Sequence, residues 1–72
     1  MKAKHKIDPK KIGKELERLR GNRDLKTVAE AVEISISALS MYESGERVPR
    51  DDIKIALAEY YGTTVGALFF AY

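Results

Sequence analysis

The lysines and arginines are the side chains whose distribution suggests a chemical role. Residues 1–26 hold ten Lys and Arg against four Asp and Glu, a net charge of +6, whereas residues 27–72 hold three against seven, a net charge of −4. The two parts sum to the net charge of +2 of the whole chain. A basic first third is typical of a protein that meets a polyanion, but a solvated helix face with a lysine-rich tail would give the same pattern.

Other kinds of chemistry have little support. The sequence has no cysteine, and its single histidine, His5, lies among lysines, so we expect neither a disulfide nor a metal site. It shows no Ser/His/Asp, Cys/His or paired-carboxylate arrangement and no Gly-rich phosphate loop. We therefore expect neither an enzyme nor a bound cofactor. The first lysines are not followed by an apolar run, which indicates a cytoplasmic protein without a membrane segment.

Two short amphipathic segments lie at the centre of the chain, in residues 24–45. Asp24 is placed to cap the first and Ser35 to cap the second, because a short polar side chain before an apolar period is typical of a helix start. Glu33-Ile34 makes a tight joint between them, and Ser44-Gly45 ends the second. Two helices of roughly two turns each with so short a connection indicate a helix-turn-helix.

Three further helices are expected to complete one core with this motif. The first follows the helix start at Asp8-Pro9 and ends near Arg20-Gly21, the fourth runs from residue 50 or 51 to 61, and Thr64 caps the fifth. No strand pattern appears. Because each apolar stripe is too narrow for its helix to be stable alone, the helices must share a core, which predicts an all-α fold. A basic arm, residues 1–7, is expected before the domain of residues 8–72.

From Ile12 to Phe69 the sequence resembles the Cro and phage-repressor-like helix-turn-helix family, of the xenobiotic-response-element type. The resemblance is carried by Val28-Ala29, by Ile34-Ser35 and most specifically by SALSMYESGERVPR, residues 37–50. It implies a five-helix lambda-repressor-like DNA-binding domain in which helix 36–44 enters the major groove of double-stranded DNA. It also implies a small transcriptional regulator, a repressor of phage or mobile-element type, that binds a two-fold operator as a homodimer.

The resemblance assigns roles to residues in and beside the motif. The base-reading positions, on the outward side of helix 36–44, are Ile36, Ser37, Ser40 and Met41. The positions that contact the DNA backbone after this helix are Ser44, Arg47 and Arg50. Arg20 and Glu43 match the family's internal ion pair, which is structural and has no role in DNA contact.

Three positions in the motif depart from the family pattern. Where the family has Thr or Ser followed by Gln, whose side chain reaches a phosphate, this sequence has Asp24 and Leu25. The charge of Asp24 would face that phosphate, so we expect Arg23 and Lys26 to supply phosphate contacts instead. Glu33 replaces the usual glycine of the turn, and a positive φ there would cost roughly 1 kcal/mol unless the turn takes another shape.

The outward side of helix 36–44 has no Arg, Lys, Gln or Asn, the side chains that make bidentate contacts with guanine or adenine. Serine hydroxyls read either kind of base edge, and Ile36 and Met41 can touch thymine methyl groups. We therefore expect modest sequence information, with affinity from backbone contacts and DNA shape. The alternative is a protein-interaction module such as an antitoxin or anti-repressor, with Ile36 and Met41 contacting a regulatory protein partner and DNA binding weak or lost.

The last five residues, LFFAY, are more apolar than a free C-terminus usually is. A homodimer would bury them, and the candidate dimer contacts are the aromatic residues near this end, Tyr60, Phe69, Phe70 and Tyr72. Ordinary core packing is the other explanation. We expect core packing for Phe69 and leave both explanations open for Phe70 and Tyr72.

Overall fold

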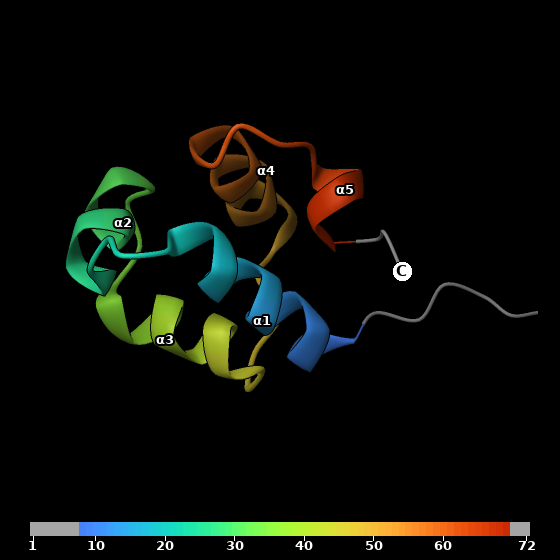
Figure 1. The fold of residues 1–72 in the computed structure, drawn as a ribbon, viewed down its shortest axis with the longest axis horizontal. Coiled ribbons are helices and arrows are strands. Elements are labelled where there is room, and N and C mark those ends of the chain that lie inside the picture. The colour runs from blue at the N-terminus through green and yellow to red at the C-terminus, as the bar shows by residue number, and fades with distance from the viewer. Residues whose placement is uncertain (1–7, 70–72) are drawn as a thin grey trace, which may run out of the picture.

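The computed structural model describes residues 8–69, so the expected arm of residues 1–7, Phe70 and Tyr72 lie outside the described residues. Within 8–69 the chain forms only helices: α1 (Pro9–Arg20), α2 (Leu25–Ala31), α3 (Ile36–Ser44), α4 (Asp51–Tyr60) and α5 (Val65–Phe69). The predicted all-α fold is confirmed. In Figure 1, α1 runs through the middle of the molecule, with α2 and α3 on one side and α4 and α5 on the other.

Three of the helix starts are fixed by the side chains that the sequence suggested. Asp8 Oδ1 accepts hydrogen bonds from the amides of Lys10 and Lys11 at 3.1 and 3.3 Å, at the start of α1. Asp24 and Ser35 cap α2 and α3 in the same way. These bonds occupy amide groups that have no partner inside the helix, which is why short polar residues stand at these positions.

The last two helices differ from each other in how they start. Thr64 Oγ1 accepts from the amide of Ala67 at 3.0 Å and caps α5, as expected. No side chain caps α4, whose N-cap is Arg50. Asp51 and Asp52 stand in its first turn instead, where negative charge suits the positive end of the helix dipole.

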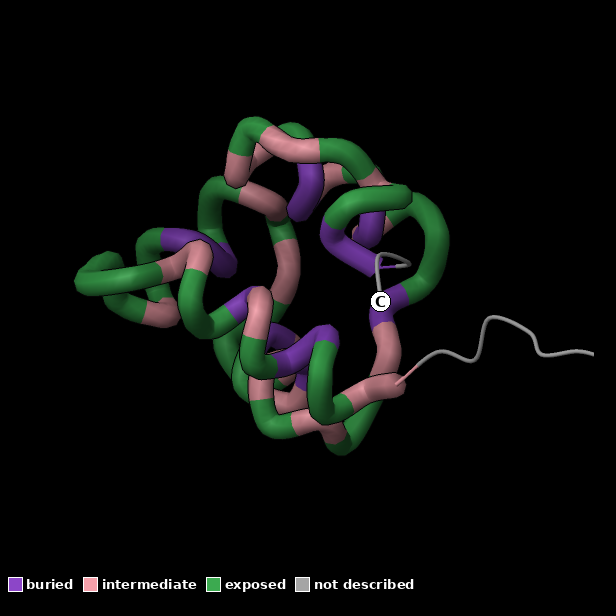
Figure 2. Tube along the Cα trace, turned by 45° about the vertical axis from the view of Figure 1, so that its right-hand side comes forward, coloured by how far each residue is buried: buried purple, intermediate pink, exposed green. Residues whose placement is uncertain are grey.

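The core consists of the predicted apolar stripes. Figure 2 shows the buried residues gathered where the helices face one another, with exposed residues on the outer turns. All five helices contribute, through Ile12, Leu16, Val28, Ala29, Leu39, Tyr42, Leu57, Ala58, Leu68 and Phe69. Burial of these side chains, rather than local propensity, holds such short helices in place.

The contact between α1 and α3 brings the two backbones together at Gly13. A Cβ atom on Gly13 would lie 2.3 Å from the carbonyl oxygen of Glu43 and 2.8 Å from that of Tyr42. No side chain fits in this space, so glycine is required for the two helices to cross at this distance. This contact fixes α3, and with it the outward side of the motif, relative to the rest of the domain.

Phe69 lies in the core and is fully shielded from solvent. Its ring centroid is 5.7 Å from the ammonium nitrogen of Lys54, a residue of α4 that is itself buried. The core-packing explanation for Phe69 is therefore confirmed, and its assignment as a dimer contact is wrong, since a shielded ring has no surface to offer a second copy. The burial of Lys54 was not predicted.

Candidate nucleic-acid interface

The two caps of the motif fix where α2 and α3 begin. Asp24 Oδ1 accepts from the amide of Thr27 at 2.9 Å, and Ser35 Oγ accepts from the amide of Ala38 at 2.9 Å. The hydrogen bonds to Thr27, helped by the charges of Lys26 and Arg20, lower the pKa of the Asp24 carboxyl below its ordinary value. Asp24 is thus a charged cap at neutral pH, at the point where the sequence places a phosphate-facing residue.

The turn between the helices has the shape that the resemblance implies, without the glycine. Glu33 has a φ of 61°, the one positive φ of a non-glycine residue in the described part of the chain. The amide of Ile34 donates to the carbonyl of Ala29 at 2.9 Å and closes the turn. A side chain in the left-handed region is a local strain that the surrounding contacts of the motif must offset.

The outward side of α3 is a band of small polar and apolar side chains. Leu39 and Tyr42 point into the core, which leaves the opposite side of the helix to solvent. Ile36, at the first position of the helix, is 45% exposed. The other outward residues are Ser37, Ser40 and Ser44, which are exposed, and Met41, which is half-buried. The four residues expected to read bases therefore lie on one surface, which we call the α3 face: Ile36, Ser37, Ser40 and Met41.

Ser44 has less capacity to bind a phosphate than its position suggests. Its hydroxyl donates to the carbonyl of Met41, one turn earlier, at 3.1 Å. A phosphate oxygen needs a donor, so Ser44 must give up this bond before it can hold one. Ser37 and Ser40 form no hydrogen bond through their hydroxyls within residues 8–69, so both are available to an external partner.

Cationic side chains flank the α3 face. Lys26 on α2 and Arg47 and Arg50 in the loop after α3 are all exposed. Arg50 shares its charge with Asp52, whose carboxylate lies 3.5 Å away, and this exposed pair is weak. The structure adds Lys10, which the sequence reading did not include: a Cβ on Gly45 would lie 3.0 Å from its Cγ, so the start of α1 lies beside the end of α3.

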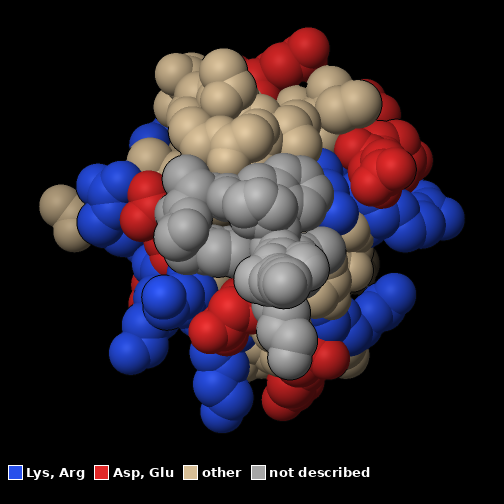
Figure 3. All heavy atoms as spheres, turned by 90° about the vertical axis from the view of Figure 1, so that its right-hand side faces the viewer, with Lys and Arg blue, Asp and Glu red and all other residues tan. Residues whose placement is uncertain are grey.

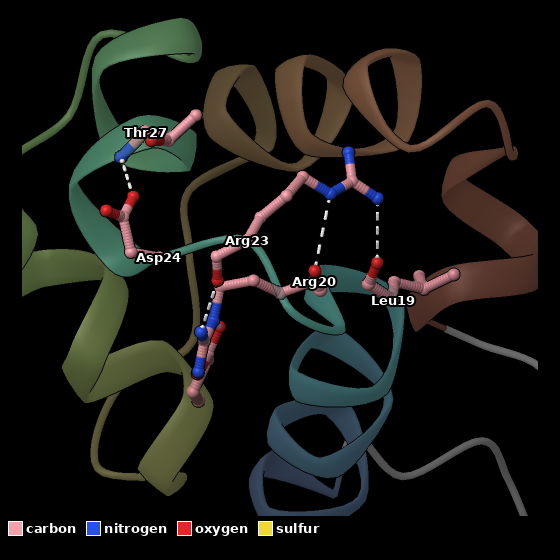
Figure 4. A network of polar contacts seen from close by, with 6 residues as sticks. Leu19, Arg20, Arg23, Asp24 and Thr27 are labelled. Atoms are coloured by element: carbon pink, nitrogen blue, oxygen red, sulfur yellow. Dashed lines mark hydrogen bonds and ion pairs between the residues drawn. The ribbon is translucent and has the colours of Figure 1, made fainter.

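Arg23, which the sequence suggested as a phosphate contact, is held at the end of α1. Its guanidinium donates to the carbonyl oxygens of Leu19 and Arg20 at 3.0 and 3.3 Å, and stands 5.3 and 5.4 Å from the ring centroids of Tyr60 and Tyr61. Figure 4 shows it reaching across the end of α1 toward α4, away from α3. In this structure Arg23 caps the end of α1 and joins it to α4, and the phosphate contact expected of this exposed side chain stays a prediction.

Arg20 and Glu43 form a two-point ion pair between α1 and α3. Nε and Nη2 of Arg20 donate to the two carboxylate oxygens of Glu43 at 2.7 and 2.9 Å, and both side chains are largely shielded. Nη1 of Arg20 also donates to the carbonyl of Arg23 at 2.7 Å, which holds the loop before α2. The hydrogen bonds that Arg20 donates to the Glu43 carboxylate raise the pKa of Arg20. This geometry serves to position the motif, because neither charge is free to meet DNA.

Tyr61 stands beside this ion pair with its hydroxyl buried. The hydroxyl makes no hydrogen bond to another group in residues 8–69. Burial, with a smaller contribution from the charge of Glu43, raises the pKa of Tyr61 to about 12. The phenol is therefore neutral over the physiological range, and it contributes apolar packing more than polar contact.

Charges of both signs are mixed on the face that Figure 3 shows, which is the right-hand side of Figure 1. There Lys and Arg side chains surround the lower part, with Asp and Glu among them. No group of acidic, histidine or cysteine residues within 8–69 is arranged to hold a metal ion. None of the described helices is long and apolar enough to cross a membrane.

Comparison with known proteins gives a consistent result. The sequence matches the family model described as a helix-turn-helix domain over residues 11–68. The fold is similar to that of the restriction-modification controller protein C.AhdI from Aeromonas hydrophila, with a TM-score of 0.78 and 25% identity over 86% of this chain and 97% of that one. The fold is also similar to that of the clp gene regulator ClgR from C. glutamicum, with a TM-score of 0.76 and 23% identity over 93% of this chain and 88% of that one. The DNA-binding domain of BldD has a TM-score of 0.71 and 26% identity, over 86% of this chain and 93% of that one. Comparison with curated proteins found no match.

Proposed function

The chain belongs to the helix-turn-helix domain family, and from this premise we propose that it is a small transcriptional regulator that inserts α3 into the major groove of an operator. The observation that supports this best is the α3 face. It is the side of the motif turned away from the core, and cations stand on its flanks at Lys10, Lys26 and Arg47. Structural neighbours with this fold include regulators of genes and a DNA-binding domain.

Phosphate contacts in this proposal come from cations on both ends of the α3 face. Lys26 belongs to α2, Arg47 and Arg50 follow α3, and Lys10 lies at the start of α1 beside Gly45. Such contacts orient the protein and give most of the affinity without carrying sequence information. Ser44 adds a contact only if its hydroxyl turns away from Met41.

The operator in this proposal is two-fold and the protein binds it as a homodimer. A nine-residue α3 reaches only a few base pairs, so a second copy is needed for a site that is rare in a genome. With Phe69 in the core, the candidate dimer contacts are Tyr60, half-buried at the end of α4, and the undescribed Phe70 and Tyr72. The two copies of α3 then lie about 34–36 Å apart. We propose that the regulator acts in the cytoplasm as a repressor of phage or mobile-element type.

The proposal is tested by titrating the full chain against random-sequence and genomic duplexes at two salt concentrations. We expect binding at low salt and a steep fall of log K with log salt, since each neutralised phosphate contributes about 0.9 to the slope. Absence of binding at low salt would reject the DNA-binding function. Sedimentation of a Phe70→Ala, Tyr72→Ala variant beside the parent tests the dimer, because the variant should be the smaller species.

A second candidate function is a protein-interaction module such as an antitoxin or anti-repressor. It is favoured by Ile36, a large apolar side chain that is 45% exposed on a surface without any Arg, Lys, Gln or Asn. Asp24, charged at neutral pH near the expected DNA backbone, also favours it. A regulatory protein partner would cover Ile36 and Met41. This function predicts that affinity for DNA is weak or absent even at low salt, so the same titration separates the two candidates.

A further inference from the structure

The chemistry of the α3 face limits which base edges it can read, if the proposed DNA binding holds. Ser37 and Ser40 each carry a hydroxyl that both donates and accepts, so each fits a donor or an acceptor on a base. Two such contacts discriminate little among the four base pairs in the major groove. Direct reading of bases therefore falls to the remaining members of the α3 face, Ile36 and Met41.

Ile36 is the better placed of the two. It is the first residue of α3, and residues at the N-terminal end of a recognition helix are those that meet base edges. Its branched side chain is 45% exposed, so it has apolar surface to offer a base. Met41 lies further along the helix and is already half-buried, so it has less surface to offer.

Only one natural base offers an apolar partner in the major groove. Guanine, cytosine and adenine present hydrogen-bond donors and acceptors there, whereas thymine presents an acceptor and the C5 methyl group. Ile36 beside any of the first three would bury polar atoms without a hydrogen bond, which is unfavourable. Beside thymine it buries a methyl group, which is favourable.

We infer that each operator half-site contains a thymine whose C5 methyl group packs against Ile36, so that the T·A pair is read through this methyl group rather than through hydrogen bonds. Specificity at this position then depends on the methyl group alone. Uracil, which pairs as thymine does but lacks the methyl group, is read as a wrong base. Cytosine methylated at C5 carries a methyl group at the same place in the groove.

The test uses the full chain and a duplex selected from a random pool for binding. Each thymine of the selected site is replaced singly by uracil, and the dissociation constant is measured at one fixed salt concentration. We expect one position per half-site at which the loss of the methyl group weakens binding about three- to five-fold, the effect of uncovering one buried methyl group. At that position 5-methylcytosine should bind more tightly than cytosine.

An Ile36→Ala variant identifies the side chain that makes the contact. Ile36 is exposed and outside the core, so the variant should fold as the parent does. It should bind the thymine and uracil duplexes equally, whereas a Met41→Ala variant should keep the difference. A methyl effect that persists in Ile36→Ala would overturn the assignment.

Failure of this inference is distinct from failure of the proposed function. If the parent binds the selected duplex with a steep salt dependence but no uracil substitution changes its affinity, the thymine contact is rejected and DNA binding stands. If no duplex is bound at low salt, the proposed function is rejected and the thymine contact with it.

Discussion

Glu33 holds a conformation that glycine usually takes. Its φ of 61° places a glutamate side chain in the left-handed region, and the turn between α2 and α3 still closes through the amide of Ile34. The sequence identified the departure from the family pattern but left the shape of the turn open. The structure shows that the motif keeps its geometry, so the strain is borne by this residue and not relieved by a different turn.

Replacing Glu33 with glycine should therefore stabilise the protein. Comparison with Glu33→Ala isolates the effect, because both variants lose the same side-chain contacts and only alanine keeps the strain. We expect the glycine variant to exceed the alanine variant by about 1 kcal/mol in the free energy of unfolding, reduced somewhat by the greater freedom of glycine in the unfolded chain. Urea denaturation measures both. An alanine variant as stable as the glycine variant would show that no strain is present.

Tyr61 gives a prediction for the dependence of stability on pH. Its pKa is raised from the ordinary 10.0 to about 12, so folding favours the neutral phenol. The stability that this preference contributes is fully present below pH 10 and is lost as the pH rises through about 12. The variant Tyr61→Phe cannot ionise, and its stability should fall less than that of the parent over this interval.

At neutral pH the same variant should be no less stable than the parent. The Tyr61 hydroxyl is buried without a hydrogen bond to another described group, so removing it removes an unfavourable burial of a polar group. Thermal unfolding at pH 7 and urea denaturation above pH 10 supply the two measurements. A loss of more than about 1 kcal/mol at neutral pH would mean that the hydroxyl makes a stabilising contact.

Arg23 shows which contacts sequence reasoning misses at the scale of a residue. Its position beside the motif suggested a phosphate contact, and nothing in the local sequence indicates that its guanidinium turns back to the end of α1. Two of the partners that hold it there, Tyr60 and Tyr61, are remote in sequence. Lys10 was missed for the same reason, since its neighbour Gly45 is brought beside it only by tertiary packing.

At the scale of the elements, the sequence predicted nearly everything that local chemistry determines. The starts of α2 and α3 follow from Asp24 and Ser35, whose side chains make the cap bonds. The end of α4 at Tyr60 is one residue earlier than predicted, and Tyr61 forms its C-cap. The distances at which helices cross are not local, and the close approach of α1 to α3 at Gly13 could not be predicted from apolar spacing.

Gly13→Ala should destabilise the protein strongly. This is the opposite of the usual effect in the middle of a helix, where alanine is the better helix former. The added Cβ would meet the carbonyl oxygen of Glu43 at 2.3 Å, and α1 and α3 must separate to make room. We expect a loss of about 1–3 kcal/mol in the free energy of unfolding. Gly66→Ala is the matched control, since a Cβ there meets nothing within 4 Å. Equal stability of both variants would show that α1 and α3 do not touch at Gly13.

At the scale of the whole molecule, the contacts of the cations divide them into two groups, to which we assign different tasks as a prediction. Arg20 and Arg23 connect α1 to α3 and to α4, and their charges are committed to a carboxylate, to carbonyl oxygens and to aromatic rings. Lys26 and Arg47 are exposed beside the α3 face. The basic first third of the sequence therefore overstates the charge available to DNA, because part of it holds the fold together.

Arg23→Gln and Arg47→Gln separate these tasks, since each removes one positive charge from the chain. Arg47→Gln should weaken binding to all duplexes alike and lower the slope of log K against log salt by about 0.9, with the free energy of unfolding unchanged. Arg23→Gln should lower the free energy of unfolding by about 1–2 kcal/mol, through the lost hydrogen bonds to α1 and the lost contact with Tyr60 and Tyr61, and leave the slope unchanged. Salt titrations of DNA binding and urea denaturation give both quantities for each variant. A lower slope in Arg23→Gln would mean that its guanidinium leaves the end of α1 when DNA binds, and the separation into two groups would then fail.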